Sequence, residues 1–153
     1  MRTNKKLQIE QLDRKIKAFN DAEKVIVPDN GWINSIRTSL NMTLEQLGSK
    51  LNITRQGAKK IEESESSGTI SLKSLKEVAQ VLNLRLVYAL IPKDGSLEKL
   101  IDSKAEELAK KIVLRTSQNM KLENQGNTDQ QIKRAIHDLT NELKREMDKS
   151  LWD

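Results

Sequence analysis

The chain has 153 residues, of which 36% are hydrophobic and 32% are charged, and its net charge is +5. No apolar run approaches the about 20 residues that cross a membrane, and the N-terminus lacks the apolar core of a signal peptide. Without cysteine there is neither a disulfide nor a thiolate metal site, and we expect a cytoplasmic protein.

The basic excess lies in the first two thirds of the chain. Residues 1–30 carry seven basic and five acidic side chains, residues 31–92 carry eight and five, and residues 93–153 carry twelve of each. A modest basic excess suits the phosphate backbone of a nucleic acid. It would also serve solubility alone.

The N-terminal part is predicted to contain two helices separated by extended chain. Residues 4–22 form the first, because apolar side chains recur there at roughly helical spacing. Residues 25–27 favour extended backbone, which Pro28 ends. Asp29 or Asn30 is predicted to cap the second helix, which runs through Leu40. Its predicted inner face consists of Trp32, Ile33, Ile36 and Leu40.

Residues 43–62 are predicted to form two short helices joined by a tight turn. Thr43 and Gln46 have the spacing of a capping box. Asn52 tolerates the left-handed conformation that a sharp turn needs. Gly48 costs about 1 kcal/mol against alanine inside a helix, so we expect a second helix to cross closely there.

The second of these helices, capped by Thr54, carries side chains suited to reading bases. Arginine can fork onto guanine, and glutamine can pair bidentately with adenine. The N-terminal end of such a helix enters the major groove in helix-turn-helix proteins. The predicted base-reading residues are Arg55, Gln56 and Lys59. The predicted phosphate contacts are Thr43, Thr54 and Lys60.

Together these features resemble the lambda-repressor-like, or XRE, helix-turn-helix family over roughly residues 31–82. The shared features are a Thr-capped first helix, a small residue at its centre, a short turn and Gln at the start of the second helix. That family also carries an Arg that pairs with a Glu at the end of the motif. The resemblance therefore implies a fold-fixing ion pair between Arg37 and Glu62. An ordinary helical hairpin, the alternative, does not need Gly48 and Asn52 together.

A loop is predicted after Glu62, followed by a helix over residues 72–82 that Ser71 caps. In the resembled family this loop lies against the DNA backbone. The resemblance therefore implies phosphate contacts from Ser66, Ser67, Gly68 and Thr69. The acids Glu63 and Glu65 argue against a very close approach.

Residues 84–91 are predicted to form a β-strand, because β-favouring residues alternate between two polar boundaries. The alternating positions are Leu84, Leu86, Tyr88 and Leu90. A lone strand leaves its backbone groups unpaired, so its partner would be residues 25–27 or the same strand of a second subunit. We favour the second subunit, and a further helix is the alternative.

Two helices over residues 96–123 and 128–150 are predicted to form a C-terminal hairpin, with a turn at residues 124–127. Thr128 and Gln131 make a second capping box. The sequence contains no phosphate-binding glycine loop, nucleophile elbow or paired-histidine motif, and so predicts neither an enzyme nor a cofactor. The single histidine, His137, predicts no metal site.

The order of elements resembles the family named mobile mystery protein A. The resembling segments are TNKKLQIEQLDRK, PDNGWINSIR, the helix-turn-helix and VYALIPKDGSLEKLI with its helical tail. That family is typically encoded beside a Fic-domain protein, which implies an antitoxin-like repressor of its own operon. Inhibitory segments of Fic antitoxins carry a hydroxyl residue four positions before Glu. Asn119 and Glu123 come nearest to this spacing, but Asn119 has no hydroxyl group. This argues against direct blocking of the active site of a Fic-domain partner.

The sequence thus predicts a mainly α protein, a lambda-repressor-like helix-turn-helix bundle with a short β-strand and flanking N- and C-terminal helices. Residues 1–28 form a helix and linker, residues 29–92 the DNA-binding domain, and residues 93–153 a hairpin for dimerisation or partner binding. The protein is predicted to be a homodimeric transcriptional repressor that binds a palindromic operator in double-stranded DNA, with a Fic-domain toxin as a possible partner. The alternative is a protein-interaction module that sequesters a toxin and has little DNA-binding role.

Overall fold

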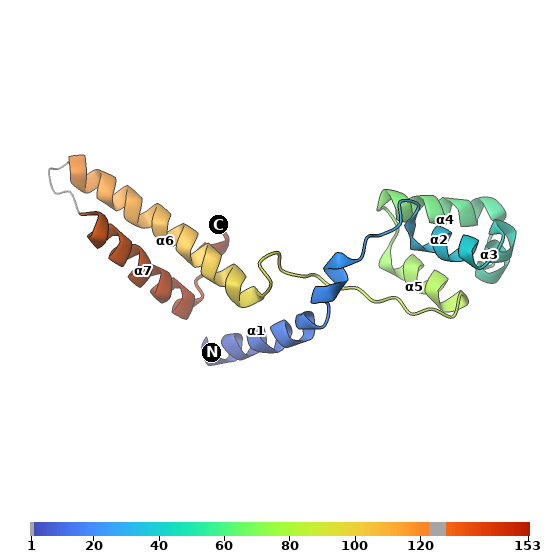
Figure 1. Ribbon diagram of the computed structural model, residues 1–153, viewed down its shortest axis with the longest axis horizontal. Coiled ribbons are helices and arrows are strands. Elements are labelled where there is room, and N and C mark those ends of the chain that lie inside the picture. The colour runs from blue at the N-terminus through green and yellow to red at the C-terminus, as the bar shows by residue number, and fades with distance from the viewer. Residues whose placement is uncertain (1, 123–127) are drawn as a thin grey trace. The chain divides into compact units, whose positions relative to one another are not determined.

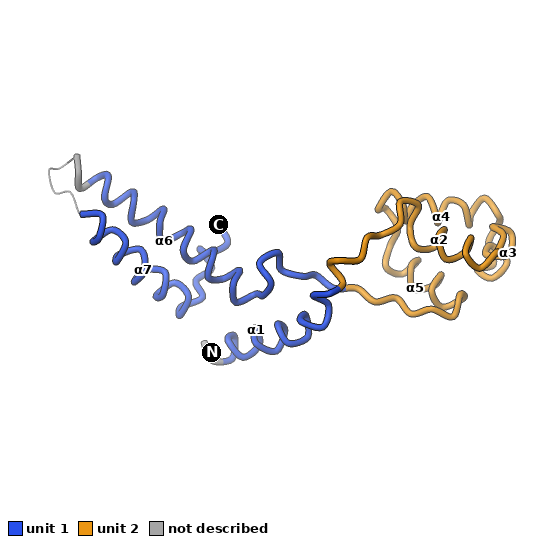
Figure 2. Tube along the Cα trace, viewed as in Figure 1, with its two compact units in different colours: residues 1–21, 89–153 blue, residues 22–88 orange. Residues whose placement is uncertain are grey.

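The computed structural model describes residues 2–122 and 128–153, and these form seven α-helices and two short 3-10 helices (Figure 1). The chain divides into two compact units (Figure 2). Unit 1 comprises residues 1–21 and 89–153, and unit 2 comprises residues 22–88. In sequence, unit 2 therefore interrupts unit 1, and the stretch 43–62 lies wholly within unit 2.

Unit 2 is a four-helix bundle with a small core. Its helices are α2 (Gly31–Ser39), α3 (Leu44–Leu51), α4 (Arg55–Ser67) and α5 (Leu72–Val81). Each helix contributes one buried apolar residue to this core, namely Ile33, Leu47, Ala58 and Val78. The predicted inner face of α2 is wrong at two positions, because Trp32 is 43% and Leu40 is 59% exposed. Leu40 lies past the end of the helix, and Trp32 precedes Ile33 by a single residue and so faces a different side.

The turn between α3 and α4 follows the predicted chemistry. Thr43 and Gln46 form the capping box, with each backbone N–H donating to the other side chain at 2.9 and 3.1 Å. Asn52 ends α3 in the left-handed conformation with φ of 57°. The Thr54 hydroxyl accepts the N–H of Gly57 at 3.0 Å and so begins α4. These three predictions are confirmed.

Gly48 is required by the backbone of the turn. A Cβ at this position would lie 2.8 Å from the carbonyl oxygen of Ile53 and 3.0 Å from that of Thr54. The close neighbour is therefore the chain leaving α3, and the predicted reason, a crossing helix, is wrong. The glycine allows the turn to fold back against the helix it has just left.

The loop predicted directly after Glu62 is wrong for its first part, because α4 continues to Ser67 and ends at Gly68, whose φ is 81°. A serine-rich sequence can stay helical when each hydroxyl donates to a carbonyl of the preceding turn. The Ser64, Ser66 and Ser67 hydroxyls do so at 2.7, 3.1 and 3.3 Å. The next helix, α5, begins as predicted, with the Ser71 hydroxyl accepting the N–H of Ser74.

The predicted β-strand at residues 84–91 is not formed, and neither is the alternative helix. The segment is irregular, and residues 25–27 are irregular as well, so the two do not pair. A strand requires a partner for its backbone groups, and the described part of this chain offers none. The predicted dimer-strand residues Leu84, Tyr88 and Leu90 are exposed, and Leu86 is half-buried.

Unit 1 is built on a helical hairpin, as predicted. Its elements are α1 (Arg2–Lys17), α6 (Leu97–Leu122), α7 (Asp129–Glu146) and the 3-10 helix η2 (Lys149–Trp152). The other 3-10 helix, η1 (Asn20–Lys24), replaces the end of the predicted first helix. Ala105 and Ala109 of α6 are fully buried, and their small side chains let α7 approach closely. The turn predicted at residues 124–127 lies outside the described residues.

Two contacts complete unit 1. The Asp13 carboxylate of α1 accepts the N–H groups of Leu97 at 2.7 Å and Glu98 at 3.3 Å and so caps α6. Met147 adopts a φ of 48° and ends α7 four residues before the predicted limit, and η2 then places Leu151 in the core with Ile101 and Ala105. Within residues 2–122 and 128–153, no helix has the length and apolarity to cross a membrane.

The environment of Gly48 predicts an unequal pair of glycine substitutions. Gly48→Ala is expected to destabilise unit 2 by about 1–3 kcal/mol, since the new methyl group meets backbone oxygens that cannot move aside. Gly57→Ala is the matched control, because its Cβ would meet atoms no nearer than 3.4 Å and alanine is the better helix former. Denaturant melts of the two variants check this, and equal stability would show that the turn tolerates a side chain.

Candidate nucleic-acid interface

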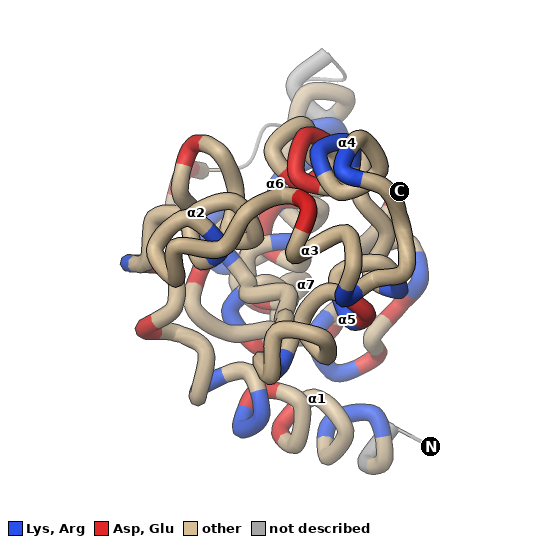
Figure 3. Tube along the Cα trace, turned by 90° about the vertical axis from the view of Figure 1, so that its right-hand side faces the viewer, with Lys and Arg blue, Asp and Glu red and all other residues tan. Residues whose placement is uncertain are grey.

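The N-terminal half of α4 presents a polar, mostly basic surface to solvent. Its exposed residues are Arg55, Gln56, Lys59 and Lys60, and Figure 3 marks the Lys and Arg residues of α4. Within the described residues, Arg55, Gln56 and Lys60 make no side-chain hydrogen bond or ion pair. Lys59 lies 4.0 Å from Glu63 with both side chains more than 60% exposed, a pairing worth little. These four side chains are therefore available to an external partner.

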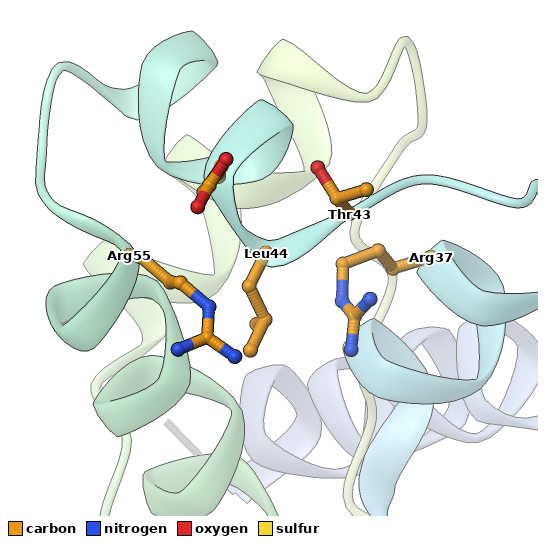
Figure 4. A pocket seen from close by; sticks show the side chains of 5 residues that line it. Arg37, Thr43, Leu44 and Arg55 are labelled. Carbon is orange, nitrogen blue, oxygen red and sulfur yellow. The ribbon is translucent and has the colours of Figure 1, made fainter.

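Beside this surface lies a cleft of ≈ 360 Å³ at the N-terminus of α3. It is lined by Arg37, Thr43, Leu44, Glu45 and Arg55, and Arg37 and Arg55 flank Leu44 in the view of Figure 4. The capping box occupies the N–H groups of Thr43 and Gln46. The N–H groups of Leu44 and Glu45 have no intrahelical acceptor. A helix N-terminus with free N–H groups beside an arginine favours an anion, while the Glu45 carboxylate opposes one.

Arg37 and Glu62, predicted as a pair, meet in the interior of unit 2. Arg37 is 9% and Glu62 is 6% exposed. The Nε and Nη2 atoms of Arg37 donate to the two carboxylate oxygens of Glu62. Arg37 Nη1 also donates to the carbonyl of Met42 at 2.7 Å, and Asn34 Nδ2 donates to Glu62 at 3.0 Å. The pair is therefore bidentate, and each side-chain nitrogen of Arg37 and each carboxylate oxygen of Glu62 has a hydrogen-bond partner, which favours the burial of two charges.

The predicted phosphate contacts at the C-terminal end of α4 already form hydrogen bonds within the chain. The Ser66 and Ser67 hydroxyls donate to helix carbonyls, and Thr69 Oγ1 lies 3.1 Å from Ser67 Oγ. Contact with a phosphate would require these hydroxyls to exchange partners. The C-terminus of a helix also carries the negative end of its dipole. The phosphate roles of Ser66, Ser67 and Thr69 stay predictions.

Sequence reasoning missed two residues that hold α4 in place. Asn34 adds a hydrogen bond to Glu62, and Glu65 turns inward, where its Oε1 accepts the N–H of Ile33 at 2.8 Å. Of the three acids on α4, two are therefore engaged with α2, and Glu63 is exposed. The spacing of Glu62 and Glu65, one helical turn, is the signal that could have placed both acids on the face toward α2.

Comparison with known proteins supports this reading of unit 2. A helix-turn-helix family model matches residues 33–88. Residues 33–88 thus form a helix-turn-helix domain of the XRE type, a class that binds DNA, and α4 is its second motif helix. No curated protein and no solved structure matches the chain. None of these findings names the mobile mystery protein A family, so that resemblance stays a prediction.

The class of domain also bears on catalysis. Helix-turn-helix domains of this class are typically DNA-binding regulators without enzymatic activity. Among the residues that the structure describes, no group of three or more His, Cys, Asp or Glu side chains could hold a metal ion.

The burial of Arg37 and Glu62 predicts a large cost for separating them. Arg37→Ala leaves the Glu62 carboxylate buried without its counter-charge, and we expect a loss of about 3–5 kcal/mol in unfolding free energy. Lys59→Ala breaks the exposed contact to Glu63 and should cost less than about 1 kcal/mol. Urea melts followed by circular dichroism measure both. Equal stabilities would mean that the Arg37–Glu62 pair is solvated and does not fix the fold.

Proposed function

We propose that the protein is a sequence-specific repressor that binds double-stranded DNA through the N-terminal half of α4. The observation that carries the proposal is the exposure of Arg55 and Gln56, free of internal partners, at the start of the second helix of a helix-turn-helix domain. In such domains the start of this helix faces base edges in the major groove. Arg55, Gln56 and Lys59 then read bases, and Lys60 and Thr54 lie beside them to contact phosphates.

The cleft at the start of α3 is the proposed seat of one backbone phosphate. It unites the free N–H groups of Leu44 and Glu45, the Thr43 residue and the Arg55 guanidinium. A phosphate there would fix the register of α4 on the duplex, because the cleft adjoins the first turn of α4. Glu45 lowers the affinity for the anion without removing the N–H donors.

We also propose that the protein binds as a homodimer to a palindromic operator. One recognition helix contacts only a few base pairs, and two related helices about 34–36 Å apart read two half-sites. The proposed interface is the α6–α7 hairpin, because α7 has an apolar stripe but no buried residue. Ile112 lies three residues after the buried Ala109 and therefore on the side of α6 that faces α7. Its side chain is nevertheless 43% exposed. A second hairpin would complete a four-helix bundle.

A second candidate is a protein-interaction module that sequesters a toxin. The observation that favours it is a groove of ≈ 620 Å³ in unit 1, between α1, α6 and α7, with Ile9, Ile101 and Met147 among its lining residues. The Fic-domain partner and the antitoxin role rest on the resemblance of element order alone. Both functions are compatible in one chain, because the groove lies in unit 1 and α4 lies in unit 2.

The base-reading role is tested on duplexes selected by the protein from a random-sequence pool. Gln56→Ala is expected to relax the preference at one base pair of each half-site, at a cost of about 1–3 kcal/mol. Lys60→Ala, the control, should weaken every duplex alike, because a phosphate contact carries no sequence information. Competition binding with single-site duplex variants measures both. An unchanged preference in Gln56→Ala would remove this residue from the reading surface.

The dimer is tested by a pair of matched substitutions on α6. Ile112→Lys places a charge in the proposed interface between two α6–α7 hairpins and should give monomers by sedimentation velocity. The affinity of the variant for the palindromic duplex should fall to that for a half-site. Leu114→Lys introduces the same charge at a comparably exposed position, 47% against 43%, but on the other side of the helix, and should stay dimeric. Dimers of Ile112→Lys would place the interface elsewhere. A further variant, Val87→Pro, then asks whether the irregular segment 84–91 supplies it.

A further inference from the structure

The N-terminus of α2 is capped by a residue from another helix. Its own N-cap, Asn30, makes no side-chain hydrogen bond. The N–H of Ile33 instead donates to Oε1 of Glu65, which comes 32 residues later on α4, at 2.8 Å. A carboxylate at this position also balances the positive end of the α2 dipole. The last turn of α4 and the first turn of α2 are thereby joined.

Gly31 makes room for this contact. A Cβ on Gly31 would lie 2.6 Å from Oε1 and 2.9 Å from Cδ of Glu65, and the φ of Gly31 is +85°. The carboxylate occupies the space that any other residue would fill with its side chain. Gly31 and Glu65 therefore form one built feature, which we call the Gly31–Glu65 latch.

The latch is the second of two polar contacts through which acids of α4 bind α2. The first is Glu62, whose carboxylate binds Arg37 near the end of α2. Glu65 binds at the start of α2, four residues before Arg37, which corresponds to a separation of about 6 Å along that helix. Ala58 also anchors α4 in the apolar core, and the two polar contacts together fix the direction of the helix along α2.

We propose that Glu65 is a positioning residue for DNA reading, which aims the distant start of α4 at the base edges. This rests on the proposed DNA-binding function. Arg55 and Gln56 lie nine or ten residues before Glu65, about 14–15 Å along the helix, so a small rotation at the latch moves them appreciably. Hydrogen bonds to bases require donor–acceptor distances within about 2.7–3.2 Å. Attraction between a lysine and a phosphate falls only slowly with distance.

Loss of the latch should consequently lower the discrimination between sequences more than the affinity for DNA in general. Glu65→Ala is expected to reduce the ratio of affinities for selected and scrambled duplexes by about tenfold or more, the equivalent of one bidentate base contact. Affinity for the scrambled duplex should be retained. Glu65→Gln should keep most of the ratio, because an amide oxygen can still accept the N–H of Ile33.

Two further variants separate the latch from other effects of the substitution. Glu63→Ala removes the same charge from an exposed position of the same helix, and should leave the ratio unchanged. Gly31→Ala pushes the carboxylate away and should lower the ratio as Glu65→Ala does. Hydrogen exchange of the Ile33 amide in the free protein reports the latch directly. It should speed up in Glu65→Ala and Gly31→Ala but not in Glu63→Ala.

The outcomes distinguish this role from the function on which it rests. A wild-type protein that prefers no duplex would overturn the proposed function, and the positioning role with it. A wild-type preference that survives in Glu65→Ala would overturn the positioning role alone. An equal loss of affinity for selected and scrambled duplexes, with lower thermal stability, would also overturn it, because Glu65 would then act on folding and not on aim.

Discussion

The buried ion pair of Arg37 and Glu62 is the contact on which the DNA-binding unit depends. Two charges are tolerated in so small a core only when each is paired and hydrogen-bonded, and here Met42 and Asn34 supply the remaining partners. The pair obliges Glu62 to face α2. Lys60 and Gln56, two and six residues earlier, then fall on other sides of the helix, where they are exposed. The same contact therefore orders the core and orients the surface proposed to read bases.

In the proposed repressor, the two units have different roles, DNA recognition and assembly. Unit 2 supplies the recognition helix and the phosphate cleft, and unit 1 supplies a hairpin whose apolar stripe is only partly covered. The chain enters and leaves unit 2 from unit 1, and Asp13 holds α1 to the start of α6. Both ends of the DNA-binding unit thus connect to one helical body. We infer that assembly through unit 1 would bring two copies of unit 2 to neighbouring sites on DNA.

The parts of the fold that the sequence predicts correctly are those fixed by near neighbours. The capping boxes at Thr43 and Thr128 and the left-handed Asn52 follow from residues within four positions of one another. The exposed set on α4 follows from helical periodicity in the same way. Serine-rich residues 63–67 were misinterpreted as a loop, because local hydroxyl bonds can satisfy a helix as well as a turn.

The parts that escaped prediction depend on partners distant in sequence. Alternation at residues 84–91 fits a strand, but only a pairing partner makes one, and periodicity carries no information about the partner. Glu65 and Asp13 cap helices that begin 34 residues before and 84 residues after them, respectively. Nothing local distinguishes these two acids from solvated ones. The DNA contacts and the dimer were predicted from chemistry and resemblance, and they remain predictions.

The most direct test of the account is the salt dependence of binding to duplex DNA. If α4 and the neighbouring cleft contact phosphates, a plot of the logarithm of the binding constant against the logarithm of the salt concentration should be a falling straight line. Each phosphate that the protein neutralises should add about −0.9 to its slope. The double variant Arg55→Ala, Lys60→Ala should give a visibly shallower slope. Weak binding with no dependence on salt, unchanged in that variant, would contradict the central claim that this helix-turn-helix surface recognises DNA.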